Sequence, residues 1–247
     1  MKICLIKQPA GLGDIIFCQK IASPILKSGY KIYWPIVDAY QETVNKYMNR
    51  DSIIFCEERD DFPMKNYYLS GITKPTKELD TENVYLPLMH SDLNYPDAAA
   101  TFNIMKVKYK MVRMDYSNWQ EHVTLKRDLD RENHLFYDVL KLTDEIQYSV
   151  VNRWFGTTWD GYRENMDIKS DLPIVEMKDL GFDNIFDWCK VFENATEIHT
   201  VDTAICYILE KLNLKANRKC WYTRNLPEKG FSYVDDVYTN TNWEFIL

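Results

Sequence analysis

The sequence has no long hydrophobic run and no long run of lysine or arginine among its 247 residues. No window approaches the roughly 18 apolar residues that a membrane-spanning helix needs, so no span is expected. The apolar run at residues 3–6 is too short for a signal peptide. Net charge is −7, whereas chains that bind a nucleic-acid backbone usually present a basic face. We therefore expect a cytoplasmic protein and regard a nucleic-acid partner as disfavoured, although a local basic groove is compatible with this average.

Paired metal ligands are also missing from the sequence. None of the six cysteines forms a Cys-x-x-Cys pair, and the four histidines are scattered. A zinc site needs ligands paired at short spacing. We expect buried, reduced thiols, and we expect neither a metal nor another cofactor. Among the histidines, His199 merits attention because it lies on a predicted strand that leads into Asp202.

The first half of the chain alternates between apolar runs and helical patterns. Strands are predicted at 2–7, 31–37 and 52–56, with helices at 15–27 and 38–48 between them. This βαβαβ order favours a parallel sheet. Pro24 is expected to kink or break the first helix, and Gly29 to end it.

The rest of the first half is less regular. Short strands are predicted at 66–69 and 83–86, and a helix at 98–111. The polar segment 112–134 follows, and the domain boundary is placed within it. We expect one Rossmann-like domain over residues 1–125 and a second over residues 126–247.

The second half repeats the alternation of strands and helices. Strands are predicted at 147–153, 172–177, 197–201 and 219–222, and helices at 134–142, 184–192 and 203–212. The last 20 residues look irregular and are expected to pack back on the first domain. The predicted fold class is therefore α/β, with two Rossmann-like domains whose parallel sheets face a cleft.

The first candidate site is the turn Gly11-Leu12-Gly13-Asp14 after the first strand. Ligands of open α/β sheets bind outside the carboxyl ends of the strands, and the glycines let the backbone approach a ligand closely. Asp14 starts a helix, where its charged form is favoured. The alternative is that Asp14 only caps this helix. The turn is neither a dinucleotide fingerprint nor a P-loop.

The second candidate site is the junction Asp202-Thr203-Ala204. A helix start offers free N–H groups, and Thr203 adds a hydroxyl, which together suit a phosphate or diphosphate. Simple capping by Asp202 or Thr203 is the alternative.

The third candidate site follows strand 147–153 and comprises Arg153, Thr157 and Thr158. An arginine at a strand end can pair with a diphosphate through two hydrogen bonds. A surface arginine over aromatic residues is the alternative.

Two segments together resemble a known family. Gly11-Leu12-Gly13-Asp14-Ile15-Ile16, with Ser23-Pro24-Ile25-Leu26 behind it, resembles the amino-terminal signature of the heptosyltransferase-like GT-B glycosyltransferases, which are related to ADP-heptose:LPS heptosyltransferases. Residues 185–212 resemble their donor-side block, with Asp202-Thr203-Ala204 at the position of Asp-Thr/Ser-Gly.

The resemblance implies an inverting, metal-independent transfer of a hexosyl or heptosyl group. The donor would be a nucleotide-diphosphate sugar bound by the second domain, and the acceptor a hydroxyl of a glycan or similar molecule bound by the first. Asp14 matches the family's general base, and Thr203 the donor-phosphate position. Arg153, Thr157 and Thr158 lie at the family's donor loop.

This sequence departs from the family pattern at two positions. Ala204 replaces a glycine, and Tyr207 replaces a histidine. The donor and the retention of catalysis therefore stay open. Three alternatives remain: a non-catalytic GT-B-like protein that binds a glycan or a partner, a DNA-modifying glycosyltransferase, and another α/β nucleotide-binding enzyme.

Overall fold

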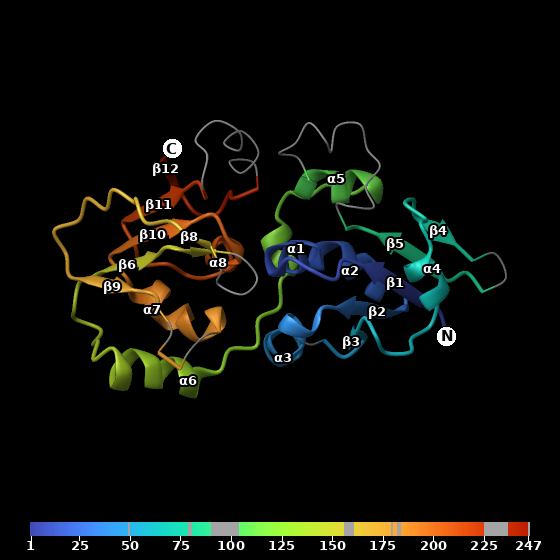
Figure 1. Cartoon of the computed structure of the whole chain (residues 1–247), viewed down its shortest axis with the longest axis horizontal. Helices are drawn as coiled ribbons and strands as arrows, with labels where there is room; N and C mark the ends of the chain where they lie inside the picture. The colour runs from blue at the N-terminus through green and yellow to red at the C-terminus, as the bar shows by residue number, and fades with distance from the viewer. Residues whose placement is uncertain are drawn as a thin grey trace. The chain divides into compact units, whose positions relative to one another are not determined.

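The chain forms two compact units, Met1–Lys126 and Arg127–Leu247. The computed structural model describes residues 1–48, 50–78, 81–89, 104–155, 161–178, 180–181, 184–224 and 237–246. Each unit contains its own five-stranded sheet (Figure 1). The α/β class with parallel sheets that the sequence predicts is confirmed.

The sheet of the first unit has the strand order β3-β2-β1-β5-β4. Its strands are β1 (Ile3–Lys7), β2 (Lys31–Ile36), β3 (Ile53–Glu57), β4 (Thr76–Lys77) and β5 (Val84–Pro87). All neighbouring pairs are parallel except β4 with β5. The three strands predicted from the βαβαβ pattern therefore pair side by side.

The helices of the first unit correct two predictions. They are α1 (Leu12–Phe17), α2 (Gln19–Lys27), α3 (Asp38–Tyr47), α4 (Lys65–Leu69) and α5 (Ile104–Met111), with a 3-10 turn η2 at Trp119–His122. The strand predicted at 66–69 is wrong, because these residues form α4. Tyrosine favours strands, but Tyr68 here packs on the Phe62 ring from one face of a helical turn. So short an aromatic run carries no decisive periodicity.

The helix predicted at 15–27 begins at Leu12 and breaks at Cys18. Pro24, the expected break point, lies inside α2. At the actual break, the Phe17 carbonyl accepts a hydrogen bond of 2.5 Å from the Tyr109 hydroxyl. The backbone acceptor at the break is thus satisfied by a side chain from α5.

The sheet of the second unit has the strand order β12-β11-β10-β6-β9. Its strands are β6 (Ser149–Asn152), β9 (Ile174–Glu176), β10 (Glu197–Val201), β11 (Arg218–Tyr222) and β12 (Glu244–Ile246). All four pairs are parallel. Taken in sequence order, this is the doubly wound 2-1-3-4-5 arrangement. The carboxyl-terminal segment, expected to be irregular, supplies the edge strand β12 beside β11. A separate antiparallel pair joins β7 (Trp154–Phe155) to β8 (Gly161–Tyr162).

Helices cover one face of this second sheet, and the segment around Met166 packs on the other. The helices are α6 (Leu129–Asn133), which continues as the π-helical η3 (His134–Val139), then η4 (Ile185–Trp188), α7 (Cys189–Asn194) and α8 (Ala204–Leu209). Helices α6 and α7 lie along one face (Figure 1). The helix predicted at 134–142 begins earlier, because the Asp128 side chain caps α6 by accepting from the Arg131 amide. On the other face, Met166 packs with Val151 and Tyr222.

No helix within the described ranges is long and apolar enough to cross a membrane.

Candidate active site

The strand order of the first unit reverses between β1 and β5, and such switch points are where ligands of α/β sheets bind. The turn after β1 lies at this place. Within it, the Gln8 side chain is 2% exposed and donates to the Ala10 carbonyl at 2.6 Å. The Gln8 carbonyl accepts from the Trp34 indole at 3.0 Å. The Val37 amide donates to the Pro9 carbonyl. These bonds hold the turn in one conformation.

Gly11 and Asp14 are packed against each other at the start of α1. Gly11 is the N-cap residue and has φ +79°, a conformation that favours glycine. Asp14 lies within the first turn of the helix, next to the half-buried Gly13. Among the described residues, no side chain makes a capping hydrogen bond at this helix end, so the alternative that Asp14 caps the helix is wrong. A Cβ atom at Gly11 would lie 2.3 Å from Asp14 Oδ2. The bare backbone at Gly11 therefore makes room for the carboxylate.

A buried lysine from α5 pairs with this carboxylate. The Lys108 side chain is 0% exposed, and its Nζ lies 3.0 Å from Asp14 Oδ1. The same ammonium donates to Gln8 Oε1 at 2.5 Å and to the Leu88 carbonyl at 2.7 Å. The site therefore joins the ends of β1 and β5 to the start of α1.

Lys108 is not among the site residues predicted from the sequence, although the sequence contains a signal for it. Met105, Lys108 and Tyr109 are spaced i, i+3, i+4 and share one helix face. All three are buried. A lysine on the apolar face of a helix requires a polar partner, and this spacing alone singles it out.

In the second unit, the switch point lies between β6 and β10. Asn152, at the end of β6, is buried and donates to Thr200 Oγ1 on β10 at 3.0 Å. It also donates to the Trp154 carbonyl and accepts from the Trp154 amide, both at 3.1 Å. One amide side chain thus joins the two strand ends. Asn152 is not among the site residues predicted from the sequence.

Asp202 and Thr203 follow β10 directly at this edge of the sheet. The Tyr238 hydroxyl donates to Asp202 Oδ1 at 3.3 Å, and the Arg224 side chain donates to the Asp202 carbonyl at 2.6 Å. Thr203 is the N-cap residue of α8, but its side chain makes no capping hydrogen bond to this helix. Tyr207, at the place of the family's histidine, is buried with its ring 5.1 Å from that of Tyr238.

Arg153 also lies at the carboxyl end of β6, and its guanidinium already has partners. Nε lies 3.2 Å from Glu176 Oε1, and Nη1 donates to the Glu164 carbonyl at 3.0 Å. Thr157 and Thr158, the other members of this predicted donor loop, fall outside the described residues.

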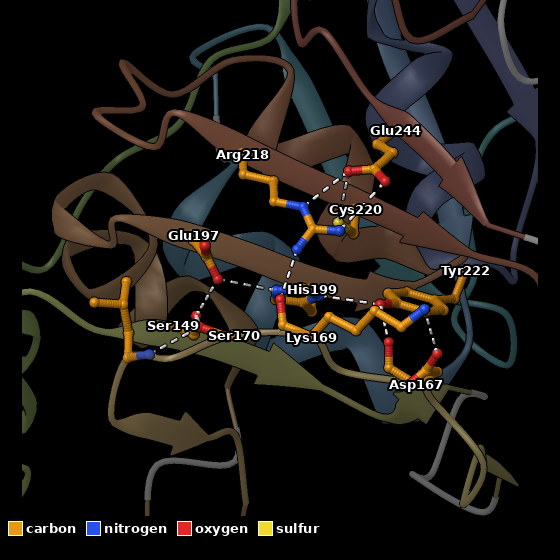
Figure 2. Close-up of polar contacts among 11 residues, drawn as sticks. Ser149, Asp167, Lys169, Ser170, Glu197, His199, Arg218, Cys220, Tyr222 and Glu244 are labelled. Atoms are coloured by element: carbon orange, nitrogen blue, oxygen red, sulfur yellow. Dashed lines mark hydrogen bonds and ion pairs between the residues drawn. The ribbon is translucent and has the colours of Figure 1, made fainter.

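His199 lies in a polar network along one sheet face, away from the strand ends. Figure 2 shows its ring between Glu197 and Tyr222. Nδ1 lies 3.0 Å from the Tyr222 hydroxyl, and Nε2 lies 3.5 Å from Glu197 Oε2. Burial lowers the pKa of His199, and Glu197 opposes this shift. Although burial alone would raise the pKa of Glu197, hydrogen bonds from Ser170, Ser149 and His199 lower it. These contacts give His199 a structural role.

Within the described part of the chain, no three or more His, Cys, Asp or Glu side chains gather closely enough to hold a metal ion.

Two units, each with a mainly parallel sheet and polar side chains at its strand ends, define a double Rossmann-like α/β protein. The solved glycosyl transferase family 9 structure from Veillonella parvula DSM 2008 has this fold. The structural alignment covers 99% of this chain and 86% of the Veillonella chain, with a TM-score of 0.55 and 9% sequence identity. At that identity the likeness shows the fold.

Two more distant structures are also similar. One is the iron-containing dodecameric glycosyltransferase TibC from enterotoxigenic E. coli H10407. The alignment covers 90% of this chain and 58% of the TibC chain, with a TM-score of 0.48 and 8% sequence identity. The other is the E. coli heptosyltransferase WaaC with ADP. The alignment covers 100% of this chain and 94% of the WaaC chain, with a TM-score of 0.45 and 10% sequence identity. No known sequence family and no curated protein sequence matches this chain.

Proposed function

We propose that this protein is a glycosyltransferase that moves a hexosyl or heptosyl group from a nucleotide-diphosphate sugar to a hydroxyl of a glycan or similar acceptor. The observation that supports this most strongly is the Asp14 carboxylate, held by Lys108 at the switch point of the first sheet. It lies at the position that the resemblance assigns to the general base. The family 9 fold is the second support.

The proposed reaction is a single displacement with inversion that uses no metal. The acceptor hydroxyl transfers its proton to Asp14 while its oxygen attacks the anomeric carbon. The bond from that carbon to the diphosphate oxygen breaks, and the nucleoside diphosphate leaves with the electron pair. The Asp14 side chain is 26% exposed, so a substrate hydroxyl can reach it.

The second unit would bind the donor. A leaving diphosphate needs cationic groups and N–H donors for its charge. Asp202 and Thr203 lie at the strand end that leads into α8, and Arg153 follows β6. Because Arg153 pairs with Glu176, a diphosphate that binds Arg153 has to displace or share that carboxylate. The resemblance adds Thr157 and Thr158, which lie outside the described residues, to this proposed donor site.

A ligand screen tests the proposal. The protein and its Asp14→Asn variant are titrated with UDP, GDP, ADP, CMP and their sugars while thermal unfolding is followed. Binding to the folded state raises the melting temperature. We expect one nucleotide diphosphate to stabilise both proteins equally. Its sugar then serves as donor, and Asp14→Asn lowers turnover by about 100- to 10,000-fold.

Asp51→Asn is the matched control, since this exposed aspartate of the same unit lies in a turn between α3 and β3. It should leave both binding and turnover unchanged. If no nucleotide stabilises the protein, the transferase proposal fails. If a nucleotide binds but no sugar is transferred or hydrolysed, the non-catalytic binding protein takes its place.

A further inference from the structure

Lys108 has a fully buried ammonium group with three acceptors. They are Asp14 Oδ1, Gln8 Oε1 and the Leu88 carbonyl, at 3.0, 2.5 and 2.7 Å. An ammonium group carries three N–H donors, so this set satisfies all of them. Burying a charged group is costly unless it is paired and hydrogen-bonded. A methionine would fill the same volume without this cost, so the charge itself calls for an explanation.

Helix α5 contacts α1 through two adjacent polar side chains. Lys108 reaches the carboxylate of Asp14 in the first turn of α1, and Tyr109 reaches the Phe17 carbonyl at its last residue. Both residues are buried. The Tyr109 hydrogen bond joins two neutral groups and holds the helix in place, whereas Lys108 brings a positive charge beside one carboxylate oxygen.

The two carboxylate oxygens of Asp14 have different surroundings. Oδ1 pairs with the ammonium, while Oδ2 lies over Gly11, where a Cβ would be 2.3 Å away. A neighbouring cation favours the charged form of a carboxylate and, with a hydrogen bond, fixes its rotamer. Gln8 in turn holds the ammonium from the turn after β1.

We propose that Lys108 is the positioning residue of this site: it holds Oδ1 of Asp14, so that Oδ2 takes the proton from the acceptor hydroxyl. This proposal rests on the proposed function, because it assumes that Asp14 is the general base. Gln8 supports Lys108 and touches no substrate. In the proposed step, only Oδ2 of Asp14 gains and loses the proton.

The test compares Lys108→Met with Tyr109→Phe, two buried changes at neighbouring positions on one helix. Lys108→Met should lower kcat by about 100-fold, as misplacement of a catalytic group does, and leave the donor KM unchanged. Tyr109→Phe should lower the melting temperature and leave kcat within about 3-fold, because no charge beside Asp14 changes. Lys108→Gln keeps two N–H donors without the charge, and it replaces Lys108→Met should that variant not fold.

A double variant separates positioning from a structural role. In the Asp14→Asn background, the change at Lys108 should cause no further loss of kcat, because Lys108 acts only through Asp14. If the two losses multiply, the proposal is overturned.

A second readout does not depend on activity. The side-chain carboxyl carbon of Asp14 is followed by ¹³C NMR at neutral pH in the intact protein. Its chemical shift should change in Lys108→Met and Lys108→Gln, which remove the ammonium group beside Oδ1, and stay in place in Tyr109→Phe. An unchanged chemical shift in the two Lys108 variants overturns the role of Lys108. A changed chemical shift in a protein that transfers no sugar supports the contact between the two residues and rejects the proposed function instead.

Discussion

Gly11 and Asp14 are matched in shape: a Cβ atom at residue 11 would lie 2.3 Å from Oδ2 and 3.0 Å from Cγ of the aspartate. Real Cβ atoms do not approach other atoms so closely, and Lys108 holds the same carboxylate through Oδ1. The glycine therefore has two separate reasons to be glycine. One is its backbone conformation, and the other is the position of the carboxylate.

Gly11→Ala should reduce both stability and transfer. A non-glycine residue in the left-handed region costs about 1–2 kcal/mol, and the new methyl displaces Asp14. Gly29→Ala is the control, because Gly29 has φ +80° but has nothing within 4 Å of a Cβ. Chemical unfolding should show a loss of stability for both variants, and a larger loss for Gly11→Ala, because its displaced carboxylate leaves the buried Lys108 ammonium. Turnover should fall only for Gly11→Ala, and equal turnover would show that the position of Asp14 does not matter.

The stability of the second unit should fall in mild acid because of His199. Burial lowers its pKa in the folded protein, whereas the unfolded chain titrates near the ordinary value of about 6.5. Below that value the unfolded state binds a proton more readily than the folded state. The stability that the neutral ring provides is therefore complete above about pH 6.5 and is lost as pH falls.

His199→Gln checks this prediction by removing the titration while retaining polar atoms for Tyr222 and Glu197. The drop in melting temperature between about pH 7.5 and pH 5.5, which spans the ordinary histidine value, should shrink in this variant. The exposed His134 lies in the same unit, and His134→Gln should leave the drop intact. An unchanged drop in His199→Gln would assign the acid sensitivity to other groups.

Glu210 should hold the carboxyl-terminal segment in place. This side chain is 2% exposed and accepts from the Asn240 amide, the Thr241 amide and the Trp243 indole at 2.6, 3.1 and 3.0 Å. Burial raises its pKa, and these donors oppose the shift.

Glu210→Gln replaces one of the two acceptor oxygens with an NH₂ group that faces donors. We expect a loss of about 1–3 kcal/mol in the free energy of unfolding, because a buried donor is left without a partner. Indole fluorescence should report looser packing of Trp243. Glu145→Gln, at an exposed position of the same unit, removes the same charge and should change neither measurement.

Local patterns in the sequence were enough to predict most of the strands and the glycine turn that leads into the helix of Asp14. Residues 197–201 were predicted as a strand and form β10 with the same bounds. A buried strand is a short apolar run between breakers, so its signal lies within a few residues. The prediction failed at 66–69, where a run of four residues was too short to separate strand from helix.

Contacts distant in the sequence were decided only by the tertiary structure. Gln8 and Lys108 lie 100 residues apart, and the ammonium between Gln8 and Asp14 exists because β5 pairs with β1 and α5 then packs on α1. The break at Cys18 and the edge strand β12 likewise depend on Tyr109 and on β11. The chain by itself determined where backbone can be extended or helical, since those preferences act over a few residues. Which side chains meet depended on strand order, which emerges only when the sheet assembles.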